Sequence, residues 1–160
     1  MLLWESARRV NPVSAHAAHN VGLELSWAQR QEEATAAFRF SLKKNKHDHA
    51  TRLALALSLR HVKKCPAALK VLRRGNKLLK PKVKRAAEGL LDAREISTLK
   101  RDQSSYMAAE ALCINDVPKM GKMLYAAVQL DPTNEFAVQQ ATDLLKLAQQ
   151  AGMVPQASQQ

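Results

Sequence analysis

The chain has 160 residues, of which 46% are hydrophobic and 24% charged, with a formal net charge of +11 at pH 7. This length suits one domain with its own hydrophobic core, and no stretch approaches the ~18 consecutive apolar residues that a membrane span requires. Glu5 interrupts the apolar N-terminus too early for a secretory signal. We therefore expect a soluble, intracellular protein without an integral membrane segment. Cytoplasm is the first expectation, and a mitochondrial location is the alternative because Arg8 and Arg9 could lie on an amphipathic presequence.

Cys65 and Cys113 are the two cysteines, and their separation matches no metal-ligand spacing. So few cysteines without a pairing pattern are typical of a reducing, intracellular setting, although a disulfide between the two is the alternative. His16 and His19 are three residues apart but lack a nearby cysteine or carboxylate cluster that would complete a metal site. We expect no bound metal and no cofactor.

Positive charge is concentrated in the middle of the sequence. Between Asp48 and Glu88 there is no acidic residue, and the same interval holds twelve lysines and arginines. A block of this kind predicts an anionic partner, either a nucleic acid or an acidic protein.

The composition predicts an all-α fold, because aromatics are 4% and good helix formers such as Ala, Leu, Lys, Gln, Glu and Arg dominate. In chain order, apolar residues recur at helical spacing at Val21 and Leu25, at Ala34, Ala37, Phe38 and Leu42, at Leu53 and Leu57, and at Ala68, Val71, Leu72 and Leu79. Predicted breaks fall at Asn11-Pro12, Lys44-Asn45-Lys46, Lys80-Pro81, Asn115-Asp116 and Asp131-Pro132.

Two intervals between these breaks are equal, because Pro12 to Lys46 and Lys46 to Lys80 each span 34 positions. Small and large residues recur within them: Gly22, Ala34 and Phe38 in the first, and Ala56, Ala68 and Leu72 in the second. In this pattern the chain resembles the tetratricopeptide repeat family, although Lys46 stands where a proline is usual. The resemblance implies a right-handed superhelical solenoid of antiparallel helix pairs, which small residues allow to approach closely.

The C-terminal part follows the family pattern less regularly. Residues 130–134 resemble the turn after a second helix, and counting back one period opens that repeat near Arg101. Residues 82–97 would then form an extra helix. The alternative register pairs a helix over 83–97 with a helix over 100–113.

The N-terminus resembles the end of a repeat, since Trp4, Ala7 and Pro12 match the pattern of a second helix. We therefore expect the array to begin in mid-repeat, as a capping helix or as half of a repeat that another chain completes. The predicted division is 1–12 as an incomplete repeat or capping helix, 15–48 and 49–82 as the two repeats, 83–150 as further helices of ambiguous register, and 151–160 as a disordered tail.

The resemblance also implies a concave groove, lined in this family by the first helix of each pair. By register the groove would present His16, His19, Leu23, Trp27, Leu53, Leu57, Arg60 and His61. It is largely apolar and lacks the Lys and Asn with which some members of the family clamp carboxylates. We expect a helix or peptide of a partner protein there, and the alternative is that the chain's own helices fill the groove.

A basic stripe is predicted on one helix, because four of its residues follow the spacing i, i+3, i+4, i+7. Together with the residues that continue it, the stripe comprises Lys70, Arg73, Arg74, Lys77, Lys80, Lys82, Lys84 and Arg85. Such a stripe suits phosphates or an acidic protein surface, whereas few aromatics accompany it to stack on bases. The alternative is a solvated face that serves solubility.

The sequence contains no glycine-rich phosphate loop and no His-Glu-x-x-His motif, so we expect the chain not to be an enzyme. The leading hypothesis is a non-enzymatic interaction scaffold or adaptor, a subunit of a larger assembly that binds a partner helix in the groove. The alternative is an RNA-contacting subunit of a ribonucleoprotein that uses the basic stripe. A less favoured third hypothesis is a secretion chaperone of the tetratricopeptide kind.

Overall fold

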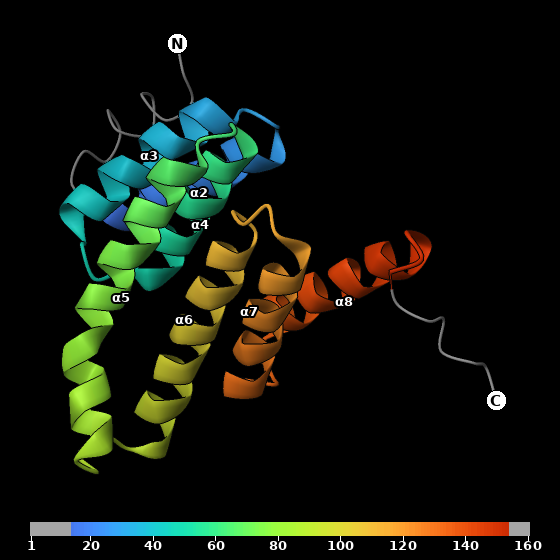
Figure 1. Cartoon of the computed structure of the whole chain (residues 1–160). Helices are drawn as coiled ribbons and strands as arrows, with labels where there is room; N and C mark the ends of the chain where they lie inside the picture. The colour runs from blue at the N-terminus through green and yellow to red at the C-terminus, as the bar shows by residue number, and fades with distance from the viewer. Residues whose placement is uncertain (1–13, 154–160) are drawn as a thin grey trace. The chain divides into compact units, whose positions relative to one another are not determined.

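The structure is a computed structural model that describes residues 14–153, and all its regular elements are α-helices (Figure 1). These residues form seven helices and no strand, which confirms the all-α prediction for this part of the chain. The predicted helix within residues 1–12 and most of the predicted tail, residues 154–160, lie outside the described residues. The chain divides into two compact units, Met1–Leu90 and Leu91–Gln160.

The first unit contains four described helices, α2 (Ala15–Trp27), α3 (Gln31–Lys44), α4 (His49–His61) and α5 (Cys65–Ala87). Each helix packs on the next one in the chain, and α2 also contacts α4 (Figure 1). The predicted break at Lys44-Asn45-Lys46 is confirmed, because α3 ends at Lys44 and the side chain of Asp48 caps α4 by accepting from Thr51 N at 3.0 Å.

The helix starts of this unit recur at a spacing of 34 residues. α2 begins at Ala15 and α4 at His49, while α3 begins at Gln31 and α5 at Cys65. Both α2 and α4 are followed by a residue in the left-handed region, Gln29 with φ 61° and Lys63 with φ 58°. In both places the next N–H reaches back into the helix, over 2.8 Å from Arg30 N to the Leu25 carbonyl and over 2.8 Å from Lys64 N to the Leu59 carbonyl.

The predicted break at Lys80-Pro81 is wrong, because α5 continues through Pro81 to Ala87. A proline inside a helix removes one backbone N–H, and at this exposed position water can satisfy the carbonyl left without that donor. The helix instead ends at Ala87, and Gly89, two residues later, has a φ of 70° that places it in the left-handed region. Leu90 N donates to the Arg85 carbonyl at 2.9 Å, which closes the helix in the same way as α2 and α4.

The second unit contains α6 (Ala93–Ala111), α7 (Val117–Leu130) and α8 (Glu135–Gln150), each in contact with the other two. The predicted breaks at Asn115-Asp116 and Asp131-Pro132 are confirmed by the bounds of α7. Both predicted registers placed a helix over 82–97 or 83–97, and both are wrong in this respect. A turn separates α5 from α6, and the side chains of Asp92 and Glu95 form a capping box at the start of α6.

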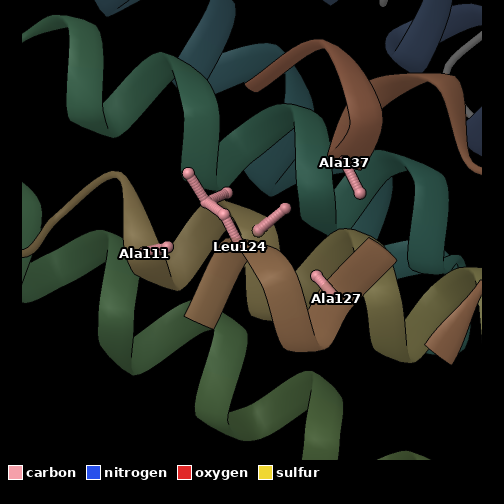
Figure 2. Packing of buried hydrophobic residues seen from close by; sticks show 5 residues of the cluster. Ala111, Leu124, Ala127 and Ala137 are labelled. Atoms are coloured by element: carbon pink, nitrogen blue, oxygen red, sulfur yellow. The ribbon is translucent and has the colours of Figure 1, made fainter. Parts of the chain in front are cut away.

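The core of the second unit is built mainly from small side chains. Ala108, Ala111, Leu124, Ala127 and Ala137 form a buried cluster on α6, α7 and α8 (Figure 2). Three methionines, Met107, Met120 and Met123, pack against it together with the half-buried Leu144. Small residues at these positions let the three helices approach closely, and the flexible methionines fill the remaining space.

Two helices of the first unit, α3 and α4, have counterparts in the second unit, α7 and α8, at an offset of 86 residues. α3 (31–44) and α7 (117–130) have equal lengths, and α4 and α8 begin at residues 49 and 135. At this offset Gly22 corresponds to Ala108 and Phe38 to Leu124, and all four residues are buried. Positions 86 residues apart in these helices are therefore structurally equivalent.

Candidate functional site

The eight residues predicted to line a groove on α2 and α4 differ in their exposure. His16, Trp27 and His61 are exposed, and Trp27 keeps 76% of its surface accessible. The others, His19, Leu23, Leu53, Leu57 and Arg60, are half-buried. None of the eight lines the cavity formed by α3, α4 and α5 or the groove along α7 and α8.

His19 is engaged in contacts within the first unit. Its Nδ1 lies 2.7 Å from the hydroxyl oxygen of Thr51, which in turn donates to Asp48 Oδ2 at 2.6 Å, so the histidine nitrogen is the donor to Thr51. The His19 ring also packs against Phe38, with 5.9 Å between the ring centroids. Burial lowers the pKa of His19. This histidine therefore connects α2 to the start of α4. The groove prediction had assigned it a role in partner binding and not this structural one.

The first unit has a basic cavity of about 780 Å³ formed by α3, α4 and α5. Six of its lining residues are basic and none is acidic; the basic ones are Arg39, Lys43, Lys46, Arg52, Lys70 and Arg74. The remaining lining residues are aliphatic: Leu42, Leu55, Leu59, Ala67 and Val71. The cavity therefore combines concentrated positive charge with an apolar wall, and we call it the basic cavity.

Arg52 is the buried member of this set, with 4% of its surface exposed. Its Nη2 donates to the backbone carbonyl of Lys46, in the turn between α3 and α4. That turn is shaped by its own polar side chains, because His47 N donates to Asn45 Oδ1 at 3.2 Å and Asp48 caps α4. The Asn45–Asp48 turn thus sets the orientation of the guanidinium group.

A positive environment is evident at the start of α4. Burial, followed by the positive charges of Lys82 and Arg52, lowers the pKa of His49 to about 4. The carboxylate of Asp48 acts in the opposite direction, but it does not offset these effects. Protonating His49 would add one more charge to a region that already holds several.

The eight residues of the predicted basic stripe are all exposed on α5. Two of them, Lys70 and Arg74, line the basic cavity, and the other six do not. Arg39 and Lys43 of α3 were absent from the predicted anion-binding set, although their i, i+4 spacing was a readable signal. Arg52 was missed because its burial depends on how three helices pack, which no local pattern reports.

The second unit has an apolar groove of about 500 Å³ along α7 and α8. Its lining contains no charged residue and consists of Val117, Pro118, Gly121, Leu124, Tyr125, Val128, Ala141, Leu144, Leu145, Ala148 and Met153. Tyr125, Leu145 and Met153 are exposed although they are large and mainly apolar. Sequence reasoning did not select any of these residues as a site, and we call the feature the apolar groove.

The two cavities lie on equivalent faces of the two units. Four lining residues of the apolar groove, Tyr125, Val128, Ala141 and Leu145, stand 86 positions after Arg39, Leu42, Leu55 and Leu59 of the basic cavity. In the first unit α5 packs on α4, and Leu59 is 1% exposed. The equivalent Leu145 is 49% exposed. The face that α5 covers in the first unit is thus open in the second.

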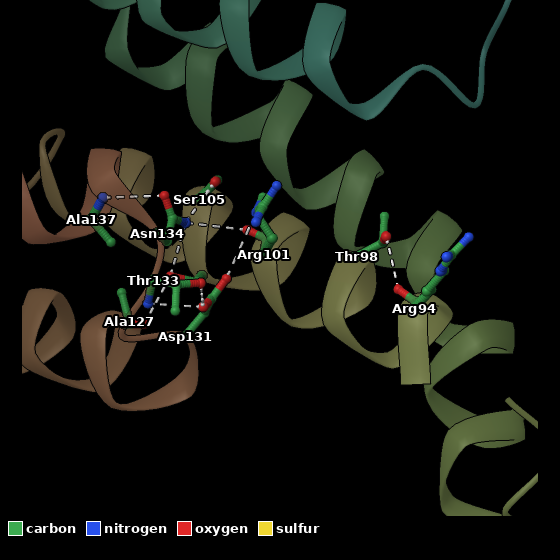
Figure 3. A network of polar contacts seen from close by, with 10 residues as sticks. Arg94, Thr98, Arg101, Ser105, Ala127, Asp131, Thr133, Asn134 and Ala137 are labelled. Atoms are coloured by element: carbon green, nitrogen blue, oxygen red, sulfur yellow. Dashed lines mark hydrogen bonds and ion pairs between the residues drawn. The ribbon is translucent and has the colours of Figure 1, made fainter. Parts of the chain in front are cut away.

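Polar side chains hold the turn between α7 and α8 in place (Figure 3). The buried amide of Asn134 donates to the hydroxyl oxygens of Ser104 and Ser105 over 3.1 and 2.8 Å, which connects the turn to α6. Asp131 Oδ1 accepts from the backbone N–H and the hydroxyl of Thr133. These bonds position the two helices that form the apolar groove.

A comparison with protein-family models finds none that matches this chain, and a comparison with curated proteins finds no relative. Within residues 14–153, no group of three His, Cys, Asp or Glu side chains is placed to hold a metal ion. No helix in this part of the chain has the length and apolar character needed to cross a bilayer. Neither Cys65 nor Cys113 is a free thiol, which counts against the expectation of reduced cysteines.

Proposed function

We propose that the chain is a non-enzymatic scaffold of tetratricopeptide-like helix pairs that binds a helix of a partner protein. The recurrence of helix starts at 34 residues in the first unit supports the repeat architecture. The observation that carries the function is the open apolar groove of the second unit, whose equivalent face in the first unit is covered by a helix. The partner site is accordingly proposed on α7 and α8, away from the predicted α2 and α4 groove.

The occupant is proposed to be a helix because α5 occupies the equivalent face in the first unit. The buried residues of α5 are Ala68, Leu72, Gly75 and Leu79, which are spaced four, three and four residues apart on one side of the helix. A partner helix with small and large apolar residues at the same spacing would cover Tyr125 and Leu145 in the same way. Full burial of one leucine contributes about 1.5–3 kcal/mol, so a few such anchors suffice for specific binding.

A small excess of positive charge on α7 and α8 favours an acidic partner. The two helices carry three exposed lysines, Lys119, Lys122 and Lys146, against two acidic residues, Glu135 and Asp143. Glutamates or aspartates on the solvent side of the partner helix would complement these lysines and speed association. The proposed partner is therefore an amphipathic helix with an apolar stripe and acidic flanks.

Two leucines of α8 provide a test with an internal control. Leu145 lines the groove, whereas Leu147 is equally apolar, 62% exposed, and does not line it. Crosslinking with mass spectrometry on the native complex, with and without nuclease, would identify the partner and the segment that contacts α7 and α8. Leu145→Asp should abolish those crosslinks, while Leu147→Asp should retain them. Equal crosslinking in both variants, or crosslinks confined to α2 and α4, would contradict the proposal.

A second function, contact with RNA in a ribonucleoprotein, is favoured by the exposure of all eight basic residues on α5. Phosphate contacts of this kind are insensitive to base sequence and weaken steeply as salt rises. Arg73 and Lys77 belong to the stripe but do not line the basic cavity, so they test the stripe alone. Arg73→Glu with Lys77→Glu should weaken RNA binding and reduce its dependence on salt, and an unchanged salt slope would exclude the stripe.

A further inference from the structure

The basic cavity brings six positive side chains together from three helices and one turn. Arg39 and Lys43 belong to α3, Lys46 to the following turn, Arg52 to α4, and Lys70 and Arg74 to α5. Since no acidic residue lines the cavity, the fold places like charges around a common space, at a cost to its own stability. An anion bound in that space would attract all six side chains and so offset the repulsion between them.

Arg52 makes the cavity more than a patch of surface charge. Arginine is rarely as buried as this one, because taking a guanidinium group out of water is costly unless partners surround it. Its hydrogen bond to the Lys46 carbonyl gives it a defined orientation in the cavity wall. A pre-oriented, partly desolvated guanidinium binds oxyanions more strongly than a mobile, hydrated lysine does.

The second unit shows that the charge is not required by the fold. At the 86-residue offset, Arg39 is replaced by Tyr125, Lys43 by Gln129, Lys46 by Pro132 and Arg52 by Val138. The helices pack in the same order there with a groove that no charged residue lines. These four basic residues of the first unit are therefore additions to a shared framework, which points to a ligand, while Lys70 and Arg74 lie on α5, which has no counterpart in the second unit.

The size of the cavity selects the class of ligand. A volume of about 780 Å³ lies within the range of small-molecule sites, roughly 300–1,000 Å³. One phosphate group carries roughly −1.5 to −2 charges at neutral pH, so two or three linked phosphates match the positive charge better than one. No aromatic residue lines the cavity to stack a base, while Leu55, Leu59 and Val71 offer an aliphatic wall.

We propose that the basic cavity binds a small ligand that carries two or three linked phosphate groups. Arg52 and Arg74 bind phosphate oxygens through their guanidinium groups, and the lysines that line the cavity neutralise the remaining charge. This site is separate from the partner-helix site in the second unit and does not depend on it.

Inorganic tripolyphosphate is the probe for this proposal, and calorimetric titration of the full chain at constant salt is the measurement. A second titration with a nucleoside triphosphate tests whether the rest of a nucleotide is also recognised. An affinity equal to that for tripolyphosphate would show that the cavity recognises the phosphates alone. A higher affinity would show that the cavity also contacts the sugar or the base. An RNA oligonucleotide arm tests the competing macromolecular ligand.

α5 supplies two matched pairs of substitutions. Lys70→Gln with Arg74→Gln removes one lysine and one arginine that line the cavity, and Arg73→Gln with Lys77→Gln removes the same two charges from the exposed stripe. The first pair should weaken tripolyphosphate binding by about tenfold or more, since each charge-assisted hydrogen bond contributes strongly. The second pair should weaken it by less than about threefold.

Arg39→Gln on α3 is the second test, because it changes the same cavity without touching α5. Circular dichroism at the same temperature verifies that each variant keeps its helices. Equal weakening by the two α5 pairs, an Arg39→Gln variant that binds as the wild type does, or no binding of tripolyphosphate would overturn the proposal. A different result would indicate a nucleic-acid surface instead of a small-ligand site. In that case RNA would bind more tightly than tripolyphosphate, and both α5 pairs would weaken RNA binding equally.

Discussion

Gly22 of α2 lies directly against the ring of Phe38 on α3: a Cβ atom at Gly22 would stand 2.5 Å from Phe38 Cε1. No real side chain tolerates so short a contact, so these two residues determine each other's size. The equivalent residues of the second unit, Ala108 and Leu124, divide the same space differently. Alanine is larger than the glycine of the first unit, and leucine is smaller than its phenylalanine. α2 and α3 can thus approach closely because the absence of a side chain at Gly22 leaves room for the large ring of Phe38.

Gly22→Ala should destabilise the chain by about 1–3 kcal/mol, because the added methyl group forces the buried Phe38 ring or the helix to move. Adding Phe38→Leu should recover much of this loss, since it reproduces the pairing of Ala108 with Leu124. The urea midpoints of the three proteins measure the effect. Phe38→Leu alone should cost about 1 kcal/mol as a cavity, and a double variant less stable than either single variant would refute the shared-volume account.

Gln29 and Lys63 end their helices in the left-handed region, where a side chain is disfavoured. Gln29→Gly and Lys63→Gly should each stabilise the chain by about 0.5–1 kcal/mol, because glycine adopts this conformation without the steric cost. Thermal unfolding followed by circular dichroism measures both. Ala28→Gly, one residue earlier at φ −74°, should give no such gain, and a matching gain there would show that the left-handed φ is not the cause.

The turns that carry their own caps were predictable from sequence, and the end of α5 was not. The ends of α7 and the start of α8 are marked by Asp116, Asp131 and Asn134, which cap the helices. Because these caps depend on local bonds, the residue types alone predict where the helices begin and end. Pro81 is a strong break signal, yet its missing hydrogen bond faces outward and costs too little to end the helix. Gly89, eight residues later, follows the actual end at Ala87.

The candidate sites were predictable only as far as single helices determine them. The spacing of Lys70 and Arg74 placed both on one face of α5, which is a local property. Their meeting with Arg39 and Arg52 depends on contacts between helices that are distant in sequence, and so does the burial of Arg52. The apolar groove escaped notice for the opposite reason, since its residues read as an ordinary buried helix face.

Acid should weaken the first unit through His49. Because the pKa of His49 is lowered from 6.5 to about 4 in the folded chain, the unfolded chain binds a proton between these values that the folded chain does not. The contribution of neutral His49 to the free energy of unfolding is therefore fully present above pH 6.5 and is lost as the pH falls towards about 4. His49→Gln should reduce the loss in urea midpoint between about pH 7 and about pH 5. An identical loss in the wild type and the variant would contradict this assignment.

Asn134→Ala should destabilise the second unit by about 2–3 kcal/mol, because it leaves two buried serine hydroxyls without their donor and removes a helix cap. Asn134→Asp keeps the cap but loses the amide donor, and it adds a charge beside Asp131; it should be more stable in mild acid than at neutral pH. Denaturant titration at two pH values tests both substitutions. Thr133→Ala, at the exposed neighbouring position, should cost under about 1 kcal/mol, and a cost equal to that of Asn134→Ala would refute the role of the buried network.

The exposed end of α5 also determines how the chain responds to proteases. Residues 80–85 are all exposed, and Lys82, Lys84 and Arg85 are trypsin sites close to the boundary between the units at Leu90. Pro81 cannot donate a backbone bond to the preceding turn, so these last turns open more readily than the rest of the helix. Brief digestion in reducing buffer should thus release two fragments that correspond to the two units. Each fragment can then be assayed by itself, one with tripolyphosphate and the other with the partner helix.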